Sequence, residues 1–187
     1  SKLSLVVREE PTGIRRYCHV GTGNYNPKTA RLYEDLGLFS ADPVLGEDLN
    51  RLFNQLSGFA PQSEFNRLMV APRGIRAKLL EKIEREIDFV KAGKTGLIRM
   101  KLNAILDEEF VEALYKASQA GVKIDLIVRG ICAIRAQVPE LSENIRVRSI
   151  LGRFLEHSRV FHFHNDGNSE FFIGSADLMD RNLNRRV

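Results

Sequence analysis

The sequence predicts an α/β fold with a mixed, mainly parallel sheet flanked by helices. The strongest observation is the order of segments between residues 97 and 130. A strand pattern at 97–102 is followed by a helical pattern at 107–120, which opens with acidic residues and is stopped by Gly121. A second strand pattern follows at 123–130. Strands separated by a helix usually pair in parallel, so this order favours a mainly parallel sheet.

The N-terminal part predicts a hairpin. Residues 3–8 and 14–20 are rich in apolar side chains, and the Glu-Pro-Thr-Gly run at 10–13 between them is typical of a turn. A further short strand is expected at 36–39. The Asp-Pro pair just before residue 44 supplies an N-cap and a first-turn proline, which predicts a helix over 44–56.

The composition becomes linker-like over residues 57–63, which divides the chain into two predicted domains, 1–57 and 64–187. The start at Ser1 and the stop at Val187 are both abrupt, so we expect a piece of a longer protein whose first domain is truncated. The other expected elements of the second domain are a strand at 68–70, a helix at 73–92, a strand at 145–150, and strands at 159–164 and 170–173 joined by a turn at 165–168.

The composition excludes some classes of protein without naming a function. Hydrophobic content of 43% with 28% charged residues is ordinary for a globular protein, and no apolar run approaches the length of a membrane span. Cys18 and Cys132 lack metal-ligand spacing and fit a reducing cytoplasm. The net charge of +4 suits a polyanionic ligand, yet it fits ATP, polyphosphate, nucleic acid or no polyanion equally well.

The chemistry is expected in the C-terminal hairpin. His157 and Arg159 are two residues apart on a predicted strand, so both side chains point to one face, while His162 and His164 point to the other. An imidazole beside a fixed cation suits phosphoryl transfer, because the ring can attack or protonate while the cation offsets charge on the phosphoryl oxygens. We therefore expect His157 and Arg159 to be catalytic.

The N-terminal hairpin repeats this plan. Lys2 opens a strand, and the hairpin closes in Gly-Thr-Gly-Asn at 21–24, which parallels Gly-Ser-Ala-Asp at 174–177. Two related halves with facing loops would form one two-sided site, in which backbone N–H groups of the loops can cradle phosphate. The phosphate-loop candidates are Gly21, Thr22, Asn24, Ser175 and Asp177.

These motifs carry a family resemblance. A His-x-Lys motif followed at a distance by Gly-Ser/Thr-x-Asn, present twice, looks like the phospholipase D superfamily. More closely, the chain resembles the type 1 polyphosphate kinases over essentially its whole length. The matching blocks are Arg-Tyr-Cys-His-Val-Gly-Thr-Gly-Asn-Tyr-Asn at 16–26, Thr-Ala-Arg-Leu-Tyr-Glu-Asp at 29–35, Leu-Ile-Val-Arg-Gly-Ile-Cys at 126–132, Leu-Glu-His-Ser-Arg-Val at 155–160 and Gly-Ser-Ala-Asp-Leu-Met-Asp-Arg-Asn-Leu at 174–183.

The resemblance implies a fold, a reaction and a set of roles. Residues 1–57 would be the end of one phospholipase D-like catalytic domain, and 64–187 most of a second. The reaction would be reversible transfer of the ATP γ-phosphate to polyphosphate through a phosphohistidine. Tyr33, Arg129 and His157 would contact ATP, and an aromatic ring such as that of Tyr33 can stack on adenine.

The resemblance also places parts of the machinery outside this chain. Ser1-Lys2 matches the end of the first His-x-Lys motif, so the phosphoryl-accepting histidine would immediately precede Ser1, and the chain alone is expected to be inactive. The arginines that contact Mg²⁺ would also lie upstream, which leaves no metal ligand within this chain. Lys2, Arg129 and Arg159 would offset the negative charge. Arg159 and Asp177 replace the Lys and Asn common in the superfamily, as in its kinase branch.

Two other functions remain open at this stage. A phosphodiesterase of the phospholipase D or nuclease type would use the same histidine chemistry with water as the acceptor. A non-catalytic polyanion-binding or assembly module is the second alternative. For the kinase, we expect ATP or ADP and polyphosphate as partners, no nucleic acid, a homo-oligomeric intact protein, no transmembrane segment and a cytoplasmic location.

Overall fold

The computed structural model describes residues 2–58, 64–72 and 74–184 of the chain. The first part of the chain contains β1 (Leu3–Glu10), β2 (Gly13–Gly21), α1 (Pro27–Ala30), β3 (Tyr33–Glu34), β4 (Gly37–Ser40) and α2 (Pro43–Leu56). The second part contains α3 (Ile75–Lys91), β5 (Leu97–Leu102), α4 (Glu108–Ala120), β6 (Lys123–Val128), β7 (Ile145–Arg148), β8 (Leu155–Glu156), β9 (Arg159–Phe163), the 3₁₀ turn η1 (Asn165–Gly167), β10 (Glu170–Gly174) and α5 (Asp180–Asn184).

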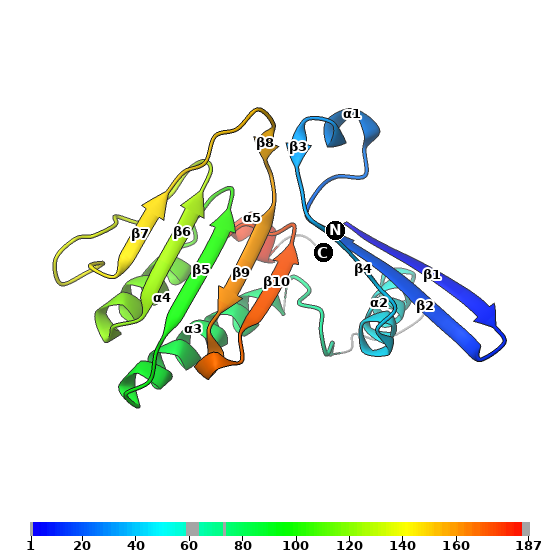
Figure 1. The fold of residues 1–187 in the computed structure, drawn as a ribbon, viewed down its shortest axis with the longest axis horizontal. Coiled ribbons are helices and arrows are strands. Elements are labelled where there is room, and N and C mark those ends of the chain that lie inside the picture. The colour runs from blue at the N-terminus through cyan, green and yellow to red at the C-terminus, as the bar shows by residue number, and fades with distance from the viewer. Residues whose placement is uncertain (1, 59–63, 73, 185–187) are drawn as a thin grey trace.

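The first part is built on the predicted hairpin. Strands β1, β2 and β4 form an antiparallel sheet in that order (Figure 1). Helix α2 begins after Asp42, whose carboxylate accepts from the backbone N–H groups of its first turn, and Pro43 follows as the sequence predicts. Cys18 of β2 is buried against Leu45 and Leu49 of α2, which gives this part a small core of its own.

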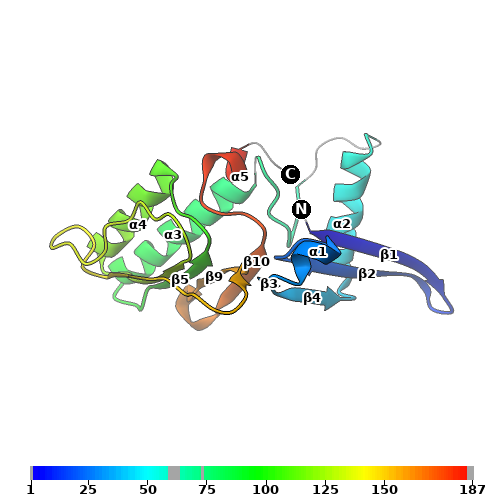
Figure 2. The same cartoon turned by 90° about the horizontal axis from the view of Figure 1, so that it is seen from above.

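The second part is built on a five-stranded mixed sheet in the order β10-β9-β5-β6-β7. Strands β5, β6 and β7 are parallel, whereas β9 runs antiparallel to both β5 and β10. The predicted α/β fold with a mixed sheet flanked by helices is therefore confirmed, but this sheet is not mainly parallel, because two of its four pairings among the described residues are antiparallel. Helices α3 and α4 lie on one side of this sheet, and α2 lies on the same side of the smaller sheet (Figure 2).

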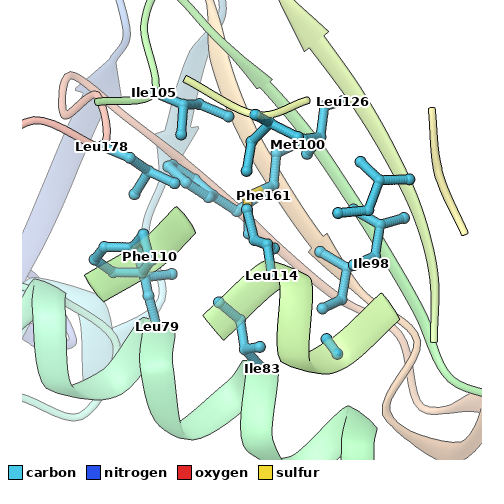
Figure 3. Close-up of a cluster of buried hydrophobic side chains, with 14 of the residues drawn as sticks. Leu79, Ile83, Ile98, Met100, Ile105, Phe110, Leu114, Leu126, Phe161 and Leu178 are labelled. Carbon is cyan, nitrogen blue, oxygen red and sulfur yellow. The ribbon is translucent and has the colours of Figure 1, made fainter. Parts of the chain in front are cut away.

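The main core lies between the five-stranded sheet and its two helices. Ile98 and Met100 alternate along β5 and point to the helices, where they meet Leu79 and Ile83 of α3 and Leu114 of α4 (Figure 3). This alternation follows from the two-residue period of a strand, which sends every second side chain to the covered face. Arg99 and Lys101, at the intervening positions, therefore point to the other face.

The predicted strand at 68–70 was wrong. Residues 66–68 instead donate their backbone N–H groups to the carboxylate of Asp48, which lies fully buried on α2. A backbone whose donors are taken by a side chain has none to give to a neighbouring strand. Part of the predicted linker, residues 59–63, and the predicted first residue of α3, Arg73, lie outside the described residues.

The structure also contains a connection that the sequence did not predict. The short strand β3 of the first part pairs in parallel with β8 of the second part, Tyr33 opposite Leu155 and Glu34 opposite Glu156 (Figure 1). Two further backbone hydrogen bonds extend this pairing, from Leu155 N to Leu32 O at 2.7 Å and from His157 N to Glu34 O at 3.0 Å. The two parts of the chain are thus joined by backbone pairing next to His157.

The buried carboxylate of Asp48 supports a prediction about stability. Burial alone would raise its pKa, but the N–H donors of Asn66, Arg67 and Leu68 outweigh that effect and hold the pKa below its usual value. Asp48→Asn puts an amide NH₂ against these donors, so we expect the free energy of unfolding to fall by about 1–3 kcal/mol in urea titrations at pH 7.

The matched control is Glu47→Gln, at the exposed neighbouring position of α2, which should change stability by less than about 0.5 kcal/mol. A lowered carboxylate pKa stabilises the fold above its unfolded value and loses that effect as the pH falls. The difference between wild type and Asp48→Asn should therefore shrink below about pH 4. Equal stability of wild type and Asp48→Asn at pH 7 would contradict this account of residues 66–68.

Candidate functional site

His157 lies where the two parts of the chain meet, between β8 and β9. Its backbone N–H is donated to Glu34 O, and its ring stacks on Tyr33 of β3 with ring centroids 4.4 Å apart and planes at 27°. The structure therefore brings together two of the residues predicted to contact ATP. They come from segments more than a hundred residues apart in the sequence.

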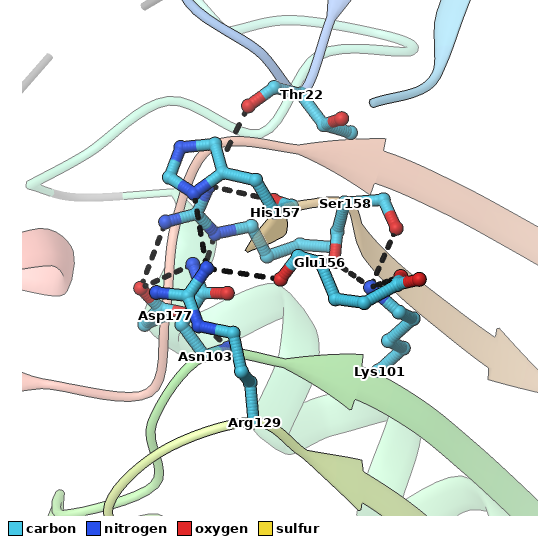
Figure 4. Close-up of polar contacts among 9 residues, drawn as sticks. Thr22, Lys101, Asn103, Arg129, Glu156, His157, Ser158 and Asp177 are labelled. Carbon is cyan, nitrogen blue, oxygen red and sulfur yellow. Dashed lines mark hydrogen bonds and ion pairs between the residues drawn. The ribbon is translucent and has the colours of Figure 1, made fainter. Parts of the chain in front are cut away.

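Three cationic side chains surround the backbone of His157. Arg129, which follows β6, donates from Nη1 to Glu156 O at 2.9 Å, and Arg159 donates from Nη1 to His157 O at 3.0 Å. Lys101 of β5 donates from Nζ to Ser158 O at 3.1 Å (Figure 4). Three consecutive carbonyls are thus each held by a different cation.

Arg159 connects the two predicted loops. It is 6% exposed, and its Nε and Nη2 donate to the Asp177 carboxylate at 3.3 and 3.0 Å. Its Nη1 also donates to Thr22 O at 3.5 Å, which reaches the 21–24 loop of the first part. Asp177 is buried too and accepts from the backbone N–H of Asn103 at 2.7 Å (Figure 4). Arg159 thus bonds to one residue of each loop, Thr22 and Asp177.

The 21–24 loop is packed tightly rather than open. The N–H groups of Gly21 and Thr22 are donated to Lys2 O and Leu36 O, both at 2.9 Å, so they already serve the fold. Gly23 lies against Asp35, because a Cβ at this glycine would come within 2.1 Å of the carboxylate. Asn24 follows as a half-buried residue. The backbone cradle expected from Gly21 and Thr22 would therefore need those two bonds to open.

Lys2 and Ser175 lie on a shared cavity between the two parts of the chain. Its volume is about 200 Å³, and its wall is largely apolar, with Val20, Phe161 and Phe172 among the lining residues. His157 is not among the described residues that line it. The cavity is thus adjacent to the cationic cluster rather than its centre.

The electrostatics keep the His157 ring neutral at pH 7. Burial lowers its pKa first, and the positive charges of Arg159, Arg129 and Lys2 lower it further, against Asp177, to about 4. Nδ1 lies 3.4 Å from Arg129 Nη1. A guanidinium can only donate, so Nδ1 is assigned as the acceptor and the ring proton as resident on Nε2. The ring can therefore donate a hydrogen bond through Nε2.

Four residues of this site were missed by the sequence analysis: Asp35, Lys101, Asn103 and Glu156. Asn103 directly follows β5, at the carboxyl end of a parallel strand where ligand sites commonly form, and that position was a usable signal. Asp35 lies beside Thr22 and Gly23, and burial, ahead of the opposing charges of Arg159 and Lys2, raises its pKa.

Neither a metal centre nor a membrane span emerges from the described ranges. Among residues 2–58, 64–72 and 74–184, no three His, Cys, Asp or Glu side chains are grouped so as to hold a metal ion. Within the same ranges, none of the helices has both the length and the apolar character needed to cross a bilayer.

The chain is similar to polyphosphate kinases by sequence and by structure. The family described as "Polyphosphate kinase C-terminal domain 2" matches residues 68–187, and "Polyphosphate kinase C-terminal domain 1" matches residues 1–62. The polyphosphate kinase of Streptomyces coelicolor is 60% identical over 100% of this chain, and that of Synechocystis sp. is 57% identical over 100% of it.

These relatives are much longer than the chain, which spans 25% of the Streptomyces coelicolor protein and 26% of the Synechocystis protein. The crystal structure of polyphosphate kinase from Porphyromonas gingivalis superposes with a TM-score of 0.91 at 42% sequence identity. The superposition covers 99% of this chain and 29% of that one.

The surroundings of His157 predict its titration. In an NMR titration of the ¹⁵N-histidine-labelled chain, with His157 assigned through His157→Gln, its midpoint should lie near pH 4 and its ring proton on Nε2 at pH 7. Between about pH 6.5 and 4 the unfolded chain binds this proton while the folded site excludes it. The free energy of unfolding should therefore decrease as the pH is lowered from about 6.5 to 4. His157→Gln should lessen that fall. A midpoint at or above 6.5 would contradict the burial and charges described.

Proposed function

Because the chain belongs to the polyphosphate kinase family, we propose that it forms one side of a site that transfers the γ-phosphate between ATP and polyphosphate. The observation that carries this proposal is the position of the His157 imidazole, which stacks on Tyr33 and lies beside the Arg129 guanidinium, while Arg159 donates to the His157 carbonyl. Cations around an uncharged ring favour a ligand that brings its own negative charge, as a triphosphate does.

Phosphoryl transfer would proceed in two steps. The imidazole expected immediately before Ser1 attacks the γ-phosphorus of ATP, and the bond to the bridging oxygen breaks so that ADP leaves with the electron pair. A terminal oxygen of polyphosphate then attacks the phosphohistidine and takes the phosphoryl group. The reverse sequence makes ATP. Both steps spread negative charge over the phosphoryl oxygens, which is the charge that positioned cations stabilise.

His157 would donate from Nε2 to an oxygen of the nucleotide phosphates. An anion near the ring favours its charged form, so binding would raise the His157 pKa from its low value and allow the ring to give a proton to the departing oxygen. Arg129 fits a direct phosphate contact, because Nη1 is its only donor with a hydrogen-bond partner among the described residues. Lys2 would add positive charge from the first part of the chain.

Tyr33 and the two loops would bind the rest of the nucleotide. One face of the Tyr33 ring stacks on His157, and we propose that the opposite face contacts adenine. Asn24 and Ser175 remain candidates for phosphate contacts.

Mg²⁺ would neutralise the phosphates of ATP when bound, but the described residues do not fit a metal site, so the roles above are assigned without the ion. Homo-oligomerisation and a cytoplasmic location complete the proposal for the whole enzyme.

Family membership favours the kinase over the two alternatives. The phosphodiesterase rests on short motifs and the polyanion-binding module on a mildly basic composition, whereas the polyphosphate kinase relatives match the full extent of this chain. The direct distinction is the acceptor, since the kinase makes phosphate chains from ATP and the phosphodiesterase uses water.

The test is substitution of His157 in a full-length polyphosphate kinase that contains this chain. Polyphosphate synthesis from radiolabelled ATP should fall by roughly 10²- to 10⁴-fold in His157→Gln, the range expected for loss of a positioned acid–base group. His164→Gln, one residue beyond the far end of β9, is the matched control and should keep turnover within about twofold. Equal activity of the two variants would refute the assignment.

A further inference from the structure

Lys101 occupies an unusual place in the site. It lies on β5, on the sheet face that α3 and α4 do not cover, and its side chain is 18% exposed. Its ammonium contacts Ser158 O at 3.1 Å, Ser158 Oγ at 2.7 Å and Glu156 Oε2 at 3.2 Å (Figure 4). These partners belong to the residues immediately before and after His157.

The donor count separates Lys101 from Arg129. An ammonium group has three N–H donors, and three acceptors already surround Lys101. A phosphate contact would therefore require breaking one of these bonds. Arg129, in contrast, uses only Nη1 within the described residues and keeps its other donors for a ligand. Lys101 thus acts on the protein rather than on the substrate.

The three bonds act on either side of His157, where the chain leaves β8 and has not yet entered β9. His157 lies in the two-residue gap between β8 and β9, so no strand pairing of its own holds its carbonyl. Glu34 fixes its N–H, Arg159 fixes its carbonyl, and Lys101 ties down both neighbours. A reacting group that shifts by about 1 Å can lose roughly 100-fold in rate, so such fixation has a kinetic consequence.

We propose that Lys101 is a positioning residue, which clamps Glu156 and Ser158 so that the His157 imidazole faces the phosphoryl group. The inference rests on the proposed function for the identity of that group, but the clamp itself can be tested on the chain without substrate. The charged or titratable groups that face the ring are Arg129, Arg159, Lys2, Asp177 and Tyr33.

The first experiment compares Lys101→Met with Arg99→Met in the ¹⁵N-histidine-labelled chain. Arg99 is the matched control, because it lies two residues away on the same face of β5 and pairs with Asp125, away from His157. Loosening of the clamp should expose the ring to water, so the His157 midpoint in Lys101→Met should rise from about 4 by about one pH unit or more. Arg99→Met should leave the midpoint unchanged. Unchanged midpoints in both variants would overturn the proposal.

A second variant separates position from charge and covers a failure of Lys101→Met to fold. Ser158→Ala removes the 2.7 Å contact and keeps the lysine charge. A smaller shift in the same direction supports the clamp. A shift in Lys101→Met with none in Ser158→Ala would show that only the lysine charge acts on the ring, and would overturn it.

Kinetics in a full-length polyphosphate kinase that contains this chain complete the test. Lys101→Met should lower kcat by roughly 10- to 100-fold and change KM for ATP by less than about threefold, as expected for misplacement without lost binding. A rise in KM alone would make Lys101 a substrate contact and overturn the proposal. Absence of ATP-dependent activity in the unsubstituted enzyme would instead refute the proposed function, and the titrations would still decide the clamp.

Discussion

Backbone pairing between Leu32–Glu34 and Leu155–His157 is the interaction on which the site depends. It places the first part of the chain against the second at residues proposed to take part in phosphoryl transfer, and the Tyr33 ring against the His157 ring. Two strands of two residues each have little stability of their own. The pairing must therefore be held by what lies on either side of it, and that is the role of the cations at residues 156–158.

Of those cations, Arg129 and Arg159 hold the backbone at residues 156 and 157 and also act electrostatically on the His157 ring. Arg159 is buried, and burial of a charge is tolerated only when the charge is paired and hydrogen-bonded, as it is with Asp177. The same network joins the ends of β5 and β9 and the loop after β10, because Asp177 also accepts from Asn103. Burial first, and then the positive charges of Arg159, Arg129 and Lys2, keep the His157 ring neutral at pH 7, so the binding of an anion beside the ring and the protonation of the ring would be linked.

Much of the architecture could be predicted because it follows from local patterns. Alternating and helical spacing gave β5, α4 and β6, and turn chemistry gave the β1–β2 and β9–β10 hairpins. The strand at 68–70 was mispredicted because its apolar pattern carries no information about the Asp48 carboxylate, which lies twenty residues before Leu68 and accepts the Leu68 N–H.

The site residues likewise include some that the sequence could predict and some that it could not. His157 and Arg159 could be proposed from their spacing and their motif, whereas Lys101 resembled any charged residue on a strand, since its partners are set by the tertiary structure. The pairing of β3 with β8 was also beyond sequence reasoning, because two residues are too few to show a period.

Amide hydrogen exchange of Leu155 and His157 in the chain tests this account most directly. Both N–H groups are donated across the junction, so the account predicts that they exchange as slowly as the amides of the β9–β10 hairpin. Exchange of both at the rate of an unfolded chain, while the hairpin stays protected, would mean that the two parts do not hold His157 between them.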